Sequence, residues 1–191
     1  MRGGRQVPPQ DRVRAFFGLP LPDPHRRALE RYLVACAAAA PGFRWTPTEN
    51  LHLTLRFLGH LDGSVAEDIA DRVAAARPRS FELELGGVGS FKRGRLARVV
   101  WLGLRRGEGE AGELAVLAEA EAVRAGLEPE SRKFHAHLTL ARARERDGAA
   151  LPELPRPPGL EAWTARELIL YRSHLGRGGS VYEPLRTITL R

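Results

Sequence analysis

The sequence His-Leu-Thr-Leu occurs twice in this chain of 191 residues, at residues 52–55 and 137–140. Along a β-strand, side chains two residues apart point to the same face. Each copy therefore places an imidazole beside a hydroxyl and directs its two leucines to the opposite, apolar face. Chance would place only about 0.2 His-x-Thr triplets in a chain of this composition. We interpret the two copies as the two halves of one active site.

His52 and His137, facing each other across a cleft, could act as an acid and a base near neutral pH. One imidazole would take a proton from water while the other gives a proton to a leaving oxygen. The hydroxyls of Thr54 and Thr139 would donate hydrogen bonds to the non-bridging oxygens of a phosphate. This arrangement suits a phosphodiester, above all a strained cyclic phosphate, and predicts that neither a metal nor a cofactor is needed.

His135 and His137 offer a second interpretation, because His-x-His on a strand puts two possible zinc ligands on one face. Arg142 and Arg144 follow this strand, and no aspartate or glutamate nearby completes a site. We therefore expect no metal there and predict that His135 lies at the edge of the cleft. The three remaining histidines are predicted to lie on the surface or in loops: His25, His60 and His174.

The elements that position the histidines follow from hydrophobic periodicity. Strands are predicted around the two motifs, at residues 51–58 and 133–141, with Gly59 ending the first strand. Asp23 and Ser64 are predicted to cap the first two helices. The other predicted strands cover residues 13–19, 43–46, 81–85, 97–104, 163–171 and 181–190, a loop covers 86–95, and helices cover about 23–40, 64–76 and 112–126.

Each histidine strand is followed by a helix or loop and then another strand, which favours a duplicated β-α-β unit. The predicted fold class is α/β (α+β), with mostly antiparallel sheets in two lobes. Residues 12–191 are predicted to form one domain, preceded by a flexible tail at residues 1–11. The proline-rich residues 151–159 are predicted to be a loop between the lobes rather than a domain boundary.

Composition narrows the class of protein. The longest apolar run, residues 32–40, is too short to span a bilayer, and the first residues lack the apolar core of a secretory signal. We therefore expect a cytoplasmic protein without membrane contact. Its single cysteine, Cys36, excludes an internal disulfide. The net charge of +7 favours a polyanion such as RNA as partner.

Several aromatic residues have two interpretations. Residues 89–95 combine a phenylalanine with basic side chains, which is typical both of a platform for an RNA end and of a solvated hairpin turn. Tyr171 and Ser173 either border the cleft or pack in the core. Trp101 and Trp163 are predicted to be core residues.

Five stretches resemble the 2H phosphoesterase superfamily, and in particular its bacterial and archaeal RNA 2′,3′-cyclic phosphodiesterase branch, also called the 2′-5′ RNA ligase family. They are VRAFFGLPLP, NLHLTLRFLG, GVGSFKRGRLARVVWLGL, FHAHLTLAR and LILYRSHLGRGGSVYEPL, which together cover most of the chain. The most specific part is the paired His-x-Thr motifs, with FLG after the first and AR after the second.

The resemblance implies a two-lobed fold with the histidine strands lining a central water-filled groove. It also implies hydrolysis of a 2′,3′-cyclic phosphate, with His52 as proton donor to the 3′ oxygen and His137 as the base that activates water. The near symmetry of the motifs leaves these two roles exchangeable. Arg142 matches an arginine that often follows the second motif and would bind phosphate or RNA backbone. Ala136 stands where the family commonly has proline.

We therefore expect a monomeric, metal-independent phosphodiesterase that acts on RNA or nucleotides with 2′,3′-cyclic phosphate ends. The reverse reaction, 2′-5′ joining of RNA ends, would use the same site. Two alternatives remain at this point: a protein that binds such RNA ends without turnover, and a metal-dependent hydrolase built on His135 and His137.

Overall fold

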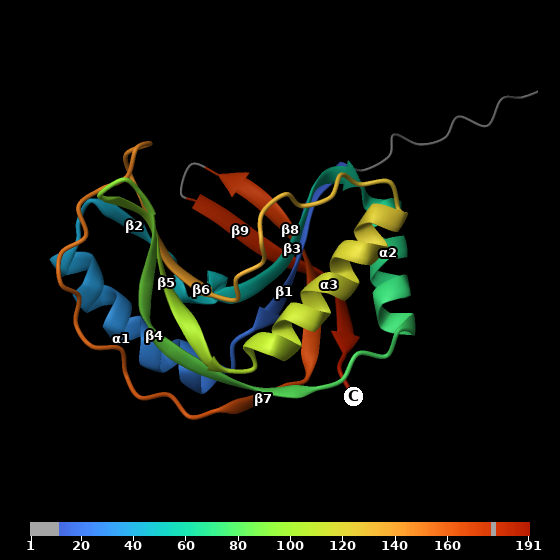
Figure 1. The fold of residues 1–191 in the computed structure, drawn as a ribbon, viewed down its shortest axis with the longest axis horizontal. Helices are drawn as coiled ribbons and strands as arrows, with labels where there is room; N and C mark the ends of the chain where they lie inside the picture. Colours follow the sequence, from blue (N-terminus) through green and yellow to red (C-terminus); the bar gives the residue numbers. More distant parts are fainter. Residues whose placement is uncertain (1–11, 177–178) are drawn as a thin grey trace, which may run out of the picture.

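The computed structural model describes residues 12–176 and 179–191 (Figure 1), so the predicted tail at residues 1–11 lies outside the described residues. The helices are α1 (Asp23–Ala39), α2 (Gly63–Ala75) and α3 (Glu108–Arg124), with a 3₁₀ turn, η1, at Thr48–Asn50. The strands are β1 (Arg12–Pro20), β2 (Phe43–Trp45), β3 (His52–Asp62), β4 (Phe81–Arg93), β5 (Leu96–Arg106), β6 (Leu138–Ala143), β7 (Trp163–Ala165), β8 (Glu167–Gly176) and β9 (Gly179–Thr189).

The strands form one sheet in the order β7-β4-β5-β6-β3-β1-β8-β9, with β2 added to β6, and every pairing is antiparallel. At the centre, β3 and β6 are paired only at Leu53 and Leu138. This narrow junction divides the sheet into a lobe of β1, β3, β8 and β9 and a lobe of β2, β4, β5, β6 and β7. The predicted α/β class with mostly antiparallel strands is confirmed.

Each lobe is covered by a helix that comes from the other lobe. The α3 helix follows β5 but packs on β3 and on α2, whereas α1 follows β1 but packs beside β2 (Figure 1). The α3 helix packs on the sheet through one apolar face. The residues of this face are buried and recur at helical spacing: Ala111, Leu114, Ala115, Ala118 and Ala122. This exchange of helices ties the two lobes together.

Several predicted boundaries are wrong for local reasons. Gly59 does not end β3: its positive φ of 74° accompanies an irregularity in the pairing with β1, and the strand continues to Asp62. The α1 helix already begins at Asp23 and α2 at Gly63, and neither has a side-chain cap, so the predicted caps at Asp23 and Ser64 are wrong.

Two loop boundaries also differ from prediction. The loop expected at residues 86–95 is a β4–β5 hairpin that turns at Gly94. The second histidine strand, expected from residue 133, begins only at Leu138, so His137 immediately precedes β6. Residues 127–137 cross irregularly from α3 to β6.

The histidines outside the motifs are placed as predicted, with one exception. His60 and His174 are exposed, but His25 is buried in α1. The Nε2 atom of His25 lies 2.8 Å from the carbonyl oxygen of Glu161, and its ring packs on Trp163. His25 therefore fastens the segment before β7 to α1. No helix among the described residues is long and apolar enough to cross a membrane.

Candidate active site

The pairing of Leu53 with Leu138 brings the two predicted motifs together. Both leucines are buried. Because side chains alternate along a strand, the neighbours of each leucine emerge on the opposite face. The antiparallel register sets His52 opposite Thr139 and Thr54 opposite His137.

This register relates the two motifs by an approximate twofold axis through the leucine pair. The histidines occupy diagonal positions, which in a regular antiparallel pair lie about 7–8 Å apart. That separation leaves room for a phosphate between two imidazoles. The structure thus gathers all four residues expected to act together, although the motifs are 85 residues apart in sequence.

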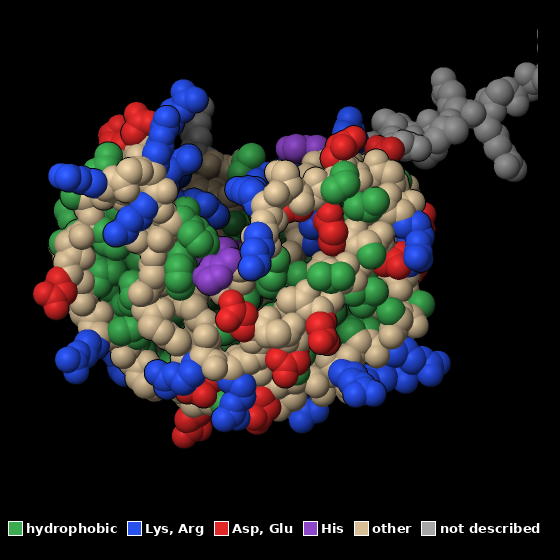
Figure 2. All heavy atoms as spheres, viewed as in Figure 1, with side chains coloured by type: hydrophobic (Ala, Val, Ile, Leu, Met, Phe, Trp, Pro, Cys, Tyr) green, Lys and Arg blue, Asp and Glu red, His purple; other side chains and the backbone are tan. Residues whose placement is uncertain are grey.

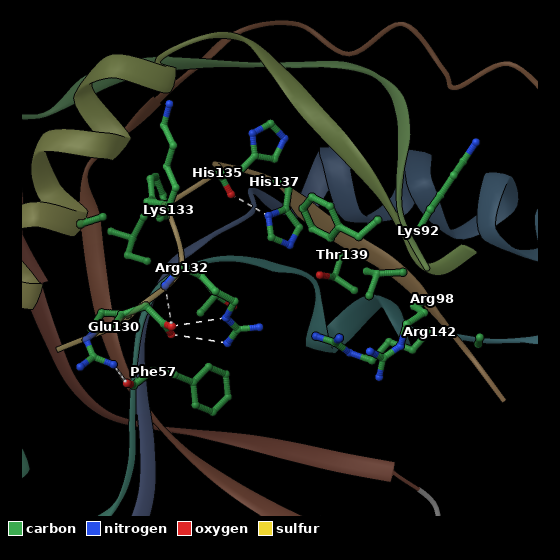
Figure 3. A pocket seen from close by; sticks show the side chains of 18 of the residues that line it. Phe57, Lys92, Arg98, Glu130, Arg132, Lys133, His135, His137, Thr139 and Arg142 are labelled. Atoms are coloured by element: carbon green, nitrogen blue, oxygen red, sulfur yellow. Dashed lines mark hydrogen bonds and ion pairs between the residues drawn. The ribbon is translucent and has the colours of Figure 1, made fainter. Parts of the chain in front are cut away.

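A groove with a volume of about 890 Å³ opens beside the junction. Thr54, His137, Thr139 and Arg142 line it (Figure 3). Figure 2 shows histidine side chains in a hollow of the surface with lysine and arginine side chains around it. His52 is not among the lining residues, but its Nε2 contacts Oγ1 of Thr54, which does line the groove.

His52 is held through both ring nitrogens. Nδ1 lies 2.7 Å from the carbonyl oxygen of Asn50, and Nε2 lies 3.0 Å from Oγ1 of Thr54. A carbonyl can only accept, so Nδ1–H donates to Asn50 and the unprotonated Nε2 accepts from the Thr54 hydroxyl. Burial lowers the pKa of His52 to about 4, and the nearby charges of Arg142 and His137 act in the same direction.

His137 repeats this arrangement. Its Nδ1 lies 2.7 Å from the carbonyl oxygen of His135, again two residues earlier in the chain, which leaves Nε2 for the groove. Burial lowers the pKa of His137 as well, and His135 and Arg142 contribute to the decrease. Both imidazoles are therefore held neutral in the free protein at pH 7, with the unprotonated Nε2 of His52 accepting from Thr54 and that of His137 left for the groove.

The two rings have different aromatic neighbours. The ring centroid of His52 lies 4.7 Å from that of Phe16 and 5.0 Å from that of Tyr182, and Tyr171 lies at 5.8 Å. Sequence reasoning missed Phe16 and Tyr182; the only signal was their position in stretches that resemble the family. Tyr171 was predicted either to border the cleft or to pack in the core; its ring stacks on Phe16 and is not among the groove-lining residues, and burial raises its pKa.

The residues around His137 come from the other lobe. Phe91 meets the His137 ring edge-on at 4.9 Å, and Trp101 packs 4.9 Å from His135. Trp101 thus supports the groove wall while remaining partly exposed, instead of being a core residue. Ser173 is buried and accepts a hydrogen bond of 2.8 Å from Nη1 of Arg14, so its role is packing.

The side chain of Arg142 is exposed at the groove and makes no hydrogen bond or ion pair with any residue in the described ranges. Arg98 lies close to it (Figure 3). Further basic side chains line the same groove: Lys92, Arg132, Lys133, Arg144 and Arg146. The groove therefore presents a positive surface suited to a phosphate chain.

His135 is half-exposed, and its Nδ1 lies 3.7 Å from Oε1 of Glu108. The rings of His135 and His137 are 6.0 Å apart between centroids. Within residues 12–176 and 179–191, no group of three or more histidine, cysteine, aspartate or glutamate side chains is arranged to hold a metal ion.

Known proteins resemble this chain in sequence and in fold. A family model described as LigT-like phosphoesterase matches residues 19–101 and 107–182. An RNA 2′,3′-cyclic phosphodiesterase of Aeropyrum pernix is 38% identical over 141 residues, which cover 72% of this chain and 80% of that protein. The enzyme of the same name from Escherichia coli is 32% identical over 174 residues, covering 91% and 94%.

Solved structures are similar over nearly the whole chain. The crystal structure of Escherichia coli LigT complexed with 3′-AMP has a TM-score of 0.80 and 30% identity, covering 94% of this chain and 99% of that one. A structure described as a phosphoesterase has a TM-score of 0.81 and 29% identity over the same shares. The chain therefore belongs to the LigT-like phosphoesterase family.

Proposed function

We propose that this protein is a metal-independent 2′,3′-cyclic phosphodiesterase that converts cyclic phosphate ends of RNA or nucleotides to 2′-phosphomonoesters. The observation that carries the proposal is the pairing of Leu53 with Leu138, because it sets two His-x-Thr motifs on either side of one groove. The relatives named RNA 2′,3′-cyclic phosphodiesterase support the same activity.

His137 would act as the base and His52 as the acid. Nε2 of His137 takes a proton from water as the water oxygen forms a bond to phosphorus. The bond between phosphorus and the 3′ oxygen breaks, and His52 delivers a proton to that oxygen. The products are a 3′-hydroxyl and a 2′-phosphate. His137 lines the groove whereas His52 does not, which favours His137 as the residue that meets water.

The negative charge of the substrate would favour protonation of His52, which must carry a proton to act as the acid. His52 is neutral when the groove is empty, since its pKa is about 4. A phosphate anion beside the imidazole favours the imidazolium and so raises this pKa on binding. Thr54 would then turn its hydroxyl from Nε2 of His52 toward a phosphate oxygen, and Thr139 would donate its hydroxyl to a phosphate oxygen from the other side.

Arg142 would bind the phosphate or the adjoining RNA backbone, since its guanidinium is exposed and unpartnered within the described part of the chain. Phe91 and Lys92 line the groove from the β4–β5 hairpin, with the Phe91 side chain 37% exposed. This placement favours the platform interpretation of that hairpin, in which Phe91 contacts the terminal nucleoside.

Joining of RNA ends by the reverse reaction would use the same atoms, with a 5′-hydroxyl in place of water. A monomeric state and a cytoplasmic location belong to the proposal as predictions from the sequence.

Product analysis tests the proposal. The protein is incubated with 2′,3′-cyclic nucleotides and with an RNA oligonucleotide that ends in a cyclic phosphate, with and without EDTA. Formation of 2′-phosphate at equal rates in both conditions is the expected result. Bound but unchanged ligand would favour the RNA-end binding protein, and activity abolished by EDTA would favour the hydrolase built on His135 and His137.

A further inference from the structure

Arg56 lies on β3 two residues beyond Thr54, where an irregularity in the pairing with β1 sets it opposite the core residue Phe17. It also lines the groove, yet only 10% of the side chain is exposed. Its Nε forms an ion pair with Oε2 of Glu119 on α3. This engagement distinguishes Arg56 from the exposed Arg142 and makes it a poor candidate for holding substrate phosphate.

The remaining donors of Arg56 reach main-chain oxygens. Nη1 donates to the carbonyl of Phe57, and Nη2 donates to the carbonyl of Glu128 at 2.8 Å. Glu119 in turn accepts a hydrogen bond from the backbone N–H of Glu130, at 2.9 Å from its Oε1. The two residues of the ion pair are therefore hydrogen-bonded to the main chain on both sides of Pro129, at Glu128 and at Glu130.

These hydrogen bonds hold the segment of the chain that leads to His137. Residues 128–133 are exposed and form neither helix nor strand. Among the described residues, the backbone of 128–133 is hydrogen-bonded to other parts of the protein only through Arg56 and Glu119. Figure 3 shows the labelled members of the segment, from Glu130 to His137, along one side of the pocket.

We infer that Arg56 and Glu119 are positioning residues that fasten the segment 128–137 to the strand of the first motif and so fix where His137 stands relative to His52. The leucine pair alone joins β3 to β6, and His137 lies just outside β6, so the β3–β6 pairing by itself fixes His137 only weakly relative to His52. The ion pair supplies a second connection between the two halves of the site. This inference rests on the proposed function for its effect on rate.

The test replaces both charges at once, because removing one partner would leave the other buried without compensation. The double variant R56M/E119M keeps side-chain size while deleting the hydrogen bonds to Glu128 and Glu130. The matched control is R72M/E121M, which removes another ion pair of α3: Arg72 Nε lies 3.2 Å from Glu121 Oε2, and Glu121 is buried. That pair joins α3 to α2 and does not touch residues 128–137.

Two readouts are measured on each folded variant: steady-state hydrolysis of a 2′,3′-cyclic nucleotide, and the pKa of His137 followed by NMR of its ring protons. We expect R56M/E119M to lower kcat about 10- to 100-fold with KM changed less than about threefold, because misplacement by about 1 Å costs rates of that size. The pKa of His137 should rise toward its ordinary value as the loosened segment admits water. R72M/E121M should change neither.

An unchanged His137 pKa in R56M/E119M would overturn the inference whatever the rate. An effect confined to KM would overturn it too, because it would make Arg56 a substrate-binding residue. Failure of the unaltered protein to hydrolyse the cyclic nucleotide would instead refute the proposed function, and the NMR comparison would still decide the positioning role.

Discussion

Leu53 and Leu138 are the one residue pair through which β3 and β6 join, within the described residues, and both are fully buried. Their contact is the point about which the two His-x-Thr motifs are related. Since no longer ladder of hydrogen bonds joins these strands, the separation of the histidines depends on packing across the lobes.

Replacing His52 or His137 by alanine should lower kcat/KM by at least about 100-fold, the usual size of an acid or base contribution. The variants should stay folded, as judged by circular dichroism. His135→Ala should lose less than about tenfold, and His60→Ala, on the same strand as His52 but exposed, serves as the control. Activity within tenfold of the unaltered protein for either motif histidine would contradict the paired-imidazole mechanism.

The pH profile of the rate should be bell-shaped, with its maximum below pH 7. The profile of kcat/KM reports the free protein, in which burial lowers the pKa of both His52 and His137. One imidazole must be charged and the other neutral, so the maximum is expected below about pH 6.5. The kcat profile should shift to higher pH, because the bound phosphate anion favours both imidazolium forms.

Measuring both profiles with a 2′,3′-cyclic nucleotide checks this prediction. A kcat/KM that rises steadily from pH 5 to pH 9 would be incompatible with an imidazole acid and base of lowered pKa.

The buried His52 should also make the fold less stable in acid. Its pKa is about 4 in the folded protein and about 6.5 when unfolded, so the unfolded chain takes up a proton first as the pH falls. His52 therefore leaves the free energy of unfolding almost unchanged above pH 6.5 and lowers it progressively as the pH falls from 6.5 to 4. Between pH 7 and pH 4.5, the free energy of unfolding should therefore fall by about 2–3 kcal/mol more than in His52→Gln.

Urea unfolding of both proteins at a series of pH values measures this difference, and other titrating groups cancel in the comparison. If the free energy of unfolding changes with pH equally in the two proteins, His52 does not have the desolvated environment that the structure indicates.

Arg142→Ala should raise KM for a cyclic-phosphate RNA end by about 10-fold or more, since a charged hydrogen bond to phosphate contributes about 1.5–3 kcal/mol. Arg142→Lys should recover part of the loss. Arg156→Ala is the control, because Arg156 is exposed in the connector between β6 and β7 and does not line the groove. Equal effects of Arg142→Ala and Arg156→Ala would reduce the role of Arg142 to general surface charge.

Much of the fold follows from local pattern, and the exceptions have local causes. The alternation of apolar residues predicted most strands, including the surroundings of both motifs. The predicted caps at Asp23 and Ser64 were wrong because a cap contributes only about 1 kcal/mol, which the chain entering each helix can override. Gly59 was expected to end a strand, but its positive φ is accommodated within the β1–β3 pairing, and β3 continues.

The sequence by itself determined which side chains of each motif share a face, because the period of two along a strand is a property of the backbone. It also indicated the chemistry, since an imidazole and a hydroxyl were repeated in the same setting. Only the tertiary structure decided that Leu53 meets Leu138, that His137 lines the groove while His52 does not, and that the Arg56 side chain is engaged while that of Arg142 is not. These facts depend on contacts between residues far apart in the chain, which arise when the two lobes exchange helices and pack.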